Sequence, residues 1–89
     1  MTLEEIIQSI HSIESYLQKF EDKYKLRSED FYEMAKNDKL EHTPDFVEWL
    51  GVYEIKLKRE KQYHEIISNR INSTDGIKLP LEEELINEA

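Results

Sequence analysis

The sequence predicts an all-α protein, a long helical hairpin with a short helix between its two arms. Apolar residues recur at alternating steps of three and four along two long stretches, which is the spacing of one helix face. A residue suited to capping a helix precedes each predicted helix. Hydrophobic residues make up 38% and charged residues 36% of the chain, a composition typical of amphipathic helices with solvated outer faces. We therefore expect helices at about 2–25, 28–38 and 43–72.

The first helix carries a heptad-like seam. Thr2 and Glu5 have the spacing of a capping box, in which each side chain accepts a hydrogen bond from the backbone N–H of the other residue. Seven apolar residues then alternate steps of three and four: Leu3, Ile6, Ile10, Ile13, Leu17, Phe20 and Tyr24. An apolar seam of this length needs a partner helix, from the same chain or from another chain.

The second helix is expected to be short. Ser28 is interpreted as its N-cap, because a serine hydroxyl can accept a hydrogen bond from a free N–H of the first turn. Glu29 and Asp30 would place negative charge near the positive end of the helix dipole. Leu40 lies in the polar connection that follows, and we expect it to pack back onto the core.

The third helix has the clearest start. Thr43 is suited to the N-cap, Pro44 to the first helical position and Asp45 to the positive end of the dipole. Trp49 is expected at the edge of an apolar stripe on this helix. The residues of the stripe are Phe46, Leu50, Tyr53 and Leu57.

Gly51 is the unusual residue of this helix, since Gly inside a helix costs about 1 kcal/mol relative to Ala. One interpretation is that Gly51 allows another backbone to approach closely. The other interpretation is that it is a tolerated surface residue, and the pattern favours neither.

Residues 1–73 are expected to form one hairpin domain, in which the first helix lies antiparallel to the third and the second covers one end. This hairpin would leave part of each apolar stripe uncovered, so a homodimeric bundle is its natural completion. The tail at 74–89 combines apolar residues with a run of three glutamates. We interpret it as a segment with one or two helical turns that docks on a partner, with a frayed or self-docked end as the alternative.

The charge and the N-terminus exclude several classes of function. The net charge of −8 argues against a general affinity for nucleic acid or for an anionic membrane. The N-terminal residues, MTLEEIIQSI, are acidic where a signal peptide is basic, and no apolar run is long enough to span a bilayer. We therefore expect a cytoplasmic protein.

No pattern in the chain indicates catalysis, a cofactor or a metal site. The absence of Cys excludes disulfides and thiolate ligands. Glu60 and His64 lie one turn apart, but no third ligand accompanies them. A chain with two Gly has no Gly-rich phosphate loop. We therefore interpret the protein as non-catalytic.

The aromatic residues are the candidates for contacts with a partner protein. Trp and Tyr are enriched at binding hot spots because they bury a large area with few torsions to freeze. We expect Trp49 to face outward, although the alternative is that the aromatic residues form the core of a small bundle. The candidate partner-binding residues are Phe31, Tyr32, Phe46, Trp49 and Tyr53, with Leu81, Leu85 and Ile86 of the tail.

The stretch KYKLRSEDFYE at 23–33, followed by DFVEW at 45–49 and YE at 53–54, carries a family resemblance. It resembles small acidic helical proteins encoded beside toxin genes in bacteria and archaea, the antitoxin-like partners of type II toxin–antitoxin modules. The chain departs from that pattern at 38–42, which lacks a Gly-Glu-Leu-Gly-type loop. The resemblance implies an inhibitor that binds and neutralises a cognate toxin. The alternative is a self-assembling structural or adaptor bundle.

Overall fold

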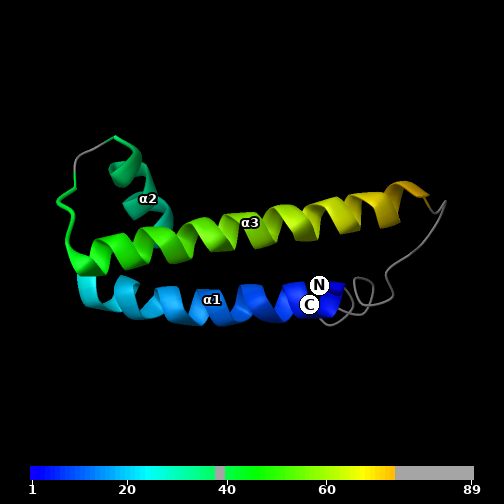
Figure 1. Cartoon of the computed structure of the whole chain (residues 1–89), viewed down its shortest axis with the longest axis horizontal. Coiled ribbons are helices and arrows are strands. Elements are labelled where there is room, and N and C mark those ends of the chain that lie inside the picture. Colours follow the sequence, from blue (N-terminus) through cyan, green and yellow to red (C-terminus); the bar gives the residue numbers. More distant parts are fainter. Residues whose placement is uncertain (38–39, 74–89) are drawn as a thin grey trace, which may run out of the picture.

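The computed structural model describes residues 1–37 and 40–73. Within these residues the chain forms three α-helices and no strand: α1 at Leu3–Tyr24, α2 at Ser28–Lys36 and α3 at Pro44–Ser73. Helices α1 and α3 lie side by side and antiparallel, and α2 covers the half of this hairpin that contains the end of α1 and the start of α3 (Figure 1). The prediction of an all-α hairpin with a short intervening helix is confirmed.

Local signals explain where the two long helices begin. The Thr2 hydroxyl accepts a hydrogen bond from the Glu5 N–H at 3.1 Å, and the Glu5 carboxylate accepts one from the Thr2 N–H at 2.7 Å. The predicted capping box is therefore present. Thr43 accepts a hydrogen bond from the Phe46 N–H at 3.1 Å, as expected of an N-cap. Helix α1 ends where Lys25 adopts the left-handed conformation, with φ of 55°.

The start of α2 differs from the prediction. Ser28 is the first helical residue rather than the N-cap, and Arg27 at the N-cap position makes no side-chain capping hydrogen bond. The carboxylate of Glu21 in α1 accepts the hydrogen bond from the Ser28 N–H instead, at 2.9 Å. The N-cap interpretation of Ser28 is wrong because a residue seven positions earlier supplies the cap.

The buried face of α3 is rotated from the predicted stripe. Trp49 is 0% exposed and Tyr53 is also buried, whereas Leu57 is 38% exposed and Leu50 is half-buried. Trp49 therefore lies at the centre of the face and not at its edge. The indole buries more apolar area than either leucine, so the lower free energy comes from turning Trp49 inward.

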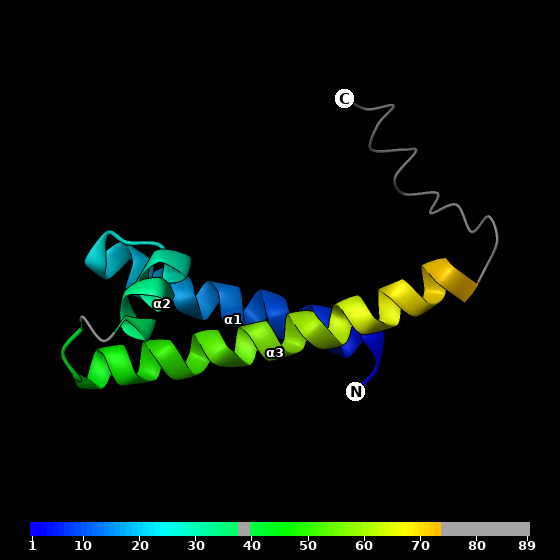
Figure 2. The same ribbon diagram turned by 90° about the horizontal axis from the view of Figure 1, so that it is seen from above.

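The main cluster of core residues lies in the half of the hairpin that α2 covers, and Ile6 of α1 is buried separately in the other half. The buried residues of this cluster come from all three helices: Leu17, Phe20, Phe31, Trp49 and Tyr53. Leu40 packs against this cluster, as predicted. Among the described residues, the other half contains only α1 and α3, and α3 extends beyond the N-terminal end of α1 (Figure 2). No described helix is long and apolar enough to cross a membrane.

Gly51 has free space around it. A Cβ added to Gly51 would meet no heavy atom within 4 Å, so no close backbone approach within the hairpin explains the glycine. We expect Gly51→Ala to raise the free energy of unfolding by about 1 kcal/mol, because Ala is the better helix former. Urea denaturation followed by circular dichroism measures this change. A destabilised Gly51→Ala variant would contradict the open environment.

Candidate functional site

The predicted aromatic cluster forms the interior of the fold. The rings of Phe31 and Trp49 stack with centroids 3.9 Å apart and an angle of 4° between their planes. Trp49 also stacks with Phe20 at 5.5 Å and with Tyr24 at 5.6 Å. One indole therefore contacts residues of both other helices, which explains why the three helices meet at this point.

A chain of hydrogen bonds satisfies the polar atoms in this core. The Trp49 Nε1–H donates to Ser28 Oγ at 2.9 Å, and the Ser28 hydroxyl donates to the Glu21 carboxylate at 2.7 Å. Ser28 is itself buried. Because a buried polar group without a partner is costly, this chain fixes how α2 sits against α1 and α3.

The expectation that Trp49 faces outward is wrong. Phe31, Trp49 and Tyr53 are all buried within the folded chain, because α1 and α2 cover the centre of the α3 face. Tyr32 and Phe46 are half-buried and keep some surface available to a partner. The aromatic residues thus behave mainly as the core alternative describes. The remaining candidates, Leu81, Leu85 and Ile86, lie with the rest of the tail outside the described residues.

Phe46 lines a shallow cavity of about 220 Å³ at the corner between α2 and α3. The other apolar residues that line this cavity are Phe31, Ala35, Leu40, Val47 and Leu50. A cavity of this size admits one apolar side chain rather than a helix. Tyr32 lies apart from it and stacks at an angle on Tyr53, with ring centroids 5.0 Å apart.

A polar cluster closes the joined end of the hairpin. The Lys23 ammonium donates to the Asp45 carboxylate at 2.6 Å, and the Tyr24 hydroxyl donates to the same oxygen. The hydrogen bond from Lys23, followed by that from Tyr24, lowers the pKa of Asp45 below its ordinary value of 3.8. The same contacts with Asp45 raise the pKa of Lys23 and the pKa of Tyr24. This cluster links α1 to the first turn of α3.

The lowered pKa of Asp45 predicts a pH dependence of stability. A carboxylate whose pKa is lower in the folded state stabilises the fold above its unfolded pKa, and this contribution is lost as the pH falls through the folded pKa. We expect Asp45→Asn to be less stable than the wild type at about pH 6, and the difference to shrink towards about pH 3. Urea midpoints of both proteins across this range measure it. An equal difference at every pH would show that Asp45 acts without its charge.

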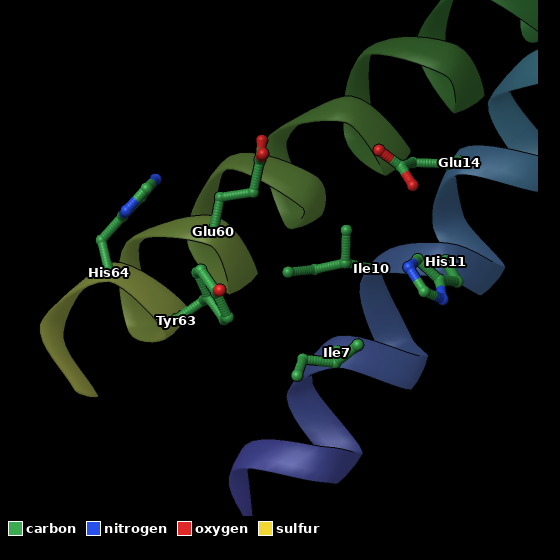
Figure 3. A pocket seen from close by; sticks show the side chains of 7 residues that line it. All are labelled: Ile7, Ile10, His11, Glu14, Glu60, Tyr63 and His64. Atoms are coloured by element: carbon green, nitrogen blue, oxygen red, sulfur yellow. The ribbon is translucent and has the colours of Figure 1, made fainter. Parts of the chain in front are cut away.

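A groove lies between α1 and α3 in the half of the hairpin that α2 leaves uncovered. Its volume is about 310 Å³. Figure 3 shows Ile7 and Ile10 of α1 and Tyr63 of α3 at the space between the two helices, with charged and polar side chains around them. The side chains at its margins are His11, Glu14, Glu60 and His64. The three apolar side chains are only half-buried, so the groove keeps an apolar floor.

Lys56 balances the charge at one end of the groove. Its ammonium lies 3.8 Å from Glu14 of α1 and 4.0 Å from Glu60 of α3, and its side chain is 17% exposed. Glu60 and His64, which lie one turn apart on α3, are two of the margin residues. Within the described residues no group of three or more Asp, Glu or His side chains could hold a metal ion. The groove therefore combines an apolar floor with a margin of mixed charge.

The groove was not identified from the sequence, although one signal of it was present. Glu60 and His64 stand where the three-and-four spacing of α3 calls for apolar residues. Polar residues can occupy these inward positions where only two helices pack together, because no third helix covers that side of the pair. The pattern did not reveal this opening, because it does not show how far α2 reaches.

These features define a three-helix hairpin with an aromatic core at one end and an open groove at the other. Comparisons of the chain with protein-family models, with curated proteins and with solved structures found no significant match. What bears on function in the folded chain is the geometry of the groove and the chemistry of the surface.

Proposed function

We propose that this chain is a non-catalytic protein-binding module, an antitoxin-like inhibitor that binds and neutralises a cognate toxin. The observation that carries the proposal is the open groove in the half of the hairpin that α2 leaves uncovered. Ile7, Ile10 and Tyr63 leave apolar surface there that no described helix covers. A segment of the toxin would lie in this groove as a third helix and bury that surface, which is the helix-in-groove mode of recognition.

The electrostatics of the chain favour a basic partner. The net charge is −8, and many toxins of this kind act on RNA through basic surfaces. Opposite net charges raise the rate of association and disfavour wrong partners. Lys56 offsets part of the charge of Glu14 and Glu60 at the groove itself, so the apolar floor would supply most of the affinity there.

The test is binding to the protein encoded by the adjacent gene. We expect the two proteins to form a complex on size-exclusion chromatography, and the chain to suppress the toxicity of its neighbour in cells. Ile7→Glu should weaken the complex at least about tenfold, because it places a carboxylate on the apolar floor. Gln8→Glu is the matched control, since Gln8 is exposed on α1 and outside the groove. Absence of a complex would refute the antitoxin proposal.

A second copy of the chain is the other candidate occupant of the groove. The same uncovered apolar floor favours it, since two hairpins joined through their open halves would form a four-helix section. In that case the protein alone sediments as a dimer and Ile7→Glu sediments as a monomer. A wild-type protein that is monomeric at all concentrations would rule out this self-assembling alternative.

A further inference from the structure

The outer side of α3 carries a second apolar surface, which the groove does not include. Val47 is 57% exposed and Ile55 is 46% exposed, and Gly51 lies midway between them. The three residues are spaced by four, so they form one ridge along the helix, which we call the outer ridge. Trp49 marks the opposite side of the same turns, because it is completely buried.

The outer face of α1 provides an internal comparison. Its exposed positions are polar, and they include Gln8, Ser12, Ser15 and Lys19. On α3 the exposed positions Val47 and Ile55 are apolar, and the half-buried Gly51 lies between them. Solvation of a helix face therefore does not explain the outer ridge. Packing within the hairpin explains it only in part, because Val47 lines the cavity at the corner between α2 and α3 yet stays 57% exposed. Nothing lies within 4 Å of a Cβ added at Gly51.

The geometry of the outer ridge fits a crossing helix. Ridges with a spacing of four interdigitate when two helices cross at about −50°, the commonest packing class in globular proteins. A glycine at the crossing point lets the two backbones approach closely. This use of Gly51 would offset the roughly 1 kcal/mol that a glycine costs within a helix.

The charges beside the outer ridge select the occupant. Glu48 and Glu54 are exposed on its two sides, and Glu48 also accepts a hydrogen bond from the Tyr16 hydroxyl of α1. A second copy crossing antiparallel at Gly51 would bring Glu48 of one copy against Glu54 of the other, which is repulsive. A helix with Lys or Arg beside the part of its apolar face that meets Gly51 would instead meet Glu48 on one side and Glu54 on the other. The exposed Lys58 lies one turn further along α3, beyond Ile55.

We propose that the outer ridge, Val47, Gly51 and Ile55, docks an amphipathic helix of a partner protein whose apolar face has small residues at its centre and basic residues at its edges. The inference rests on the proposed function in taking the partner to be a protein. It assigns that protein a second contact surface, half a turn around α3 from the groove.

The first test uses the full ¹⁵N-labelled chain and a synthetic helical peptide with a Leu and Ala ridge flanked by Lys. The chain has two Gly, so the amide signal of Gly51 is easily assigned. We expect the largest shifts at Val47, Gly51 and Ile55, and at least about tenfold weaker binding of a peptide with Glu in place of Lys. Shifts centred on Ile7 and Tyr63 would place the peptide in the groove and overturn this proposal. Absence of binding would also overturn it, as would Gly51 shifts that depend on the concentration of the chain without peptide.

The second test separates docking from folding. Gly51→Gln should keep or raise stability, because Gln is the better helix former and the position is open. It should weaken peptide binding at least about tenfold, because its side chain blocks the crossing point. Ser12→Gln on the outer face of α1 is the matched control and should bind as the wild type does. Unchanged affinity of Gly51→Gln would overturn the proposal, whereas failure to bind the neighbouring gene product would affect only the antitoxin function.

Discussion

Replacing Trp49 with Ala is expected to lower the free energy of unfolding by about 3–5 kcal/mol. The indole is completely buried and stacks on Phe31, Phe20 and Tyr24, so its removal leaves a cavity where the three helices meet. A loss of this size is a large part of the roughly 5–15 kcal/mol that stabilises a typical domain. Urea or thermal denaturation followed by far-UV circular dichroism measures it.

Val47→Ala is the matched control for this substitution. Val47 lies on the same helix two residues earlier, but its side chain is mostly exposed. We expect a change within about 0.5 kcal/mol, as for most surface substitutions. Wild-type stability of Trp49→Ala would show that the indole is not part of the core. Because Trp49→Ala is expected to destabilise the whole fold, loss of partner binding in this variant would not identify a partner surface.

The second large effect is expected at Ser28. Ser28→Ala should lower the free energy of unfolding by about 1–3 kcal/mol, since it leaves the buried Trp49 N–H without its acceptor. It also removes the hydroxyl that donates to Glu21. Ser12→Ala, at an exposed position of α1, is the control and should be neutral or slightly stabilising.

A double-mutant cycle tests the hydrogen bond itself. Trp49→Phe removes the N–H donor while keeping an aromatic ring in the core. We expect Ser28→Ala to cost less in the Trp49→Phe background than in the wild type, because no donor is then left unpaired. Equal costs in both backgrounds would mean that the Ser28 hydroxyl matters through Glu21 alone.

The groove and the outer ridge occupy different parts of the hairpin. The groove uses Ile7, Ile10 and Tyr63 at the half without α2, whereas the ridge lies on the outer side of α3 beside the core. A partner could contact both surfaces at once only by wrapping around α3. Ile7→Glu and Gly51→Gln therefore perturb the two surfaces separately, and their combined effect would report whether one partner uses both.

Much of the local structure was predictable because its causes lie within a few residues. The capping box of Thr2 and Glu5 and the cap at Thr43 are short-range hydrogen bonds, and the observed starts of α1 and α3 follow them. The apolar spacing likewise predicted two long helices. Predicting these caps and helices required only the periodicity of the helix and the side chains within one turn.

The candidate site was less predictable because its residues come together from separate helices. Ser28 was assigned as a cap, yet the Glu21 carboxylate takes that role and leaves the hydroxyl to pair with Trp49. Trp49 was expected at the edge of its face, yet it lies at the centre. Both results depend on where α2 packs, and helical periodicity does not contain that information.

By itself, the sequence determined the helices, their order, the N-caps of the two long helices and the acidic character of the chain, because these follow from neighbouring residues and from composition. Only the tertiary structure decided which face of α3 turns inward, that the aromatic cluster is mainly core, and where apolar surface stays uncovered. The physical reason is that the burial of a side chain depends on how the helices pack against one another. If α3 were rotated by half a turn about its axis, Trp49 would face outward and Val47 and Gly51 would face inward. The spacing of the residues along the sequence would be the same in both orientations.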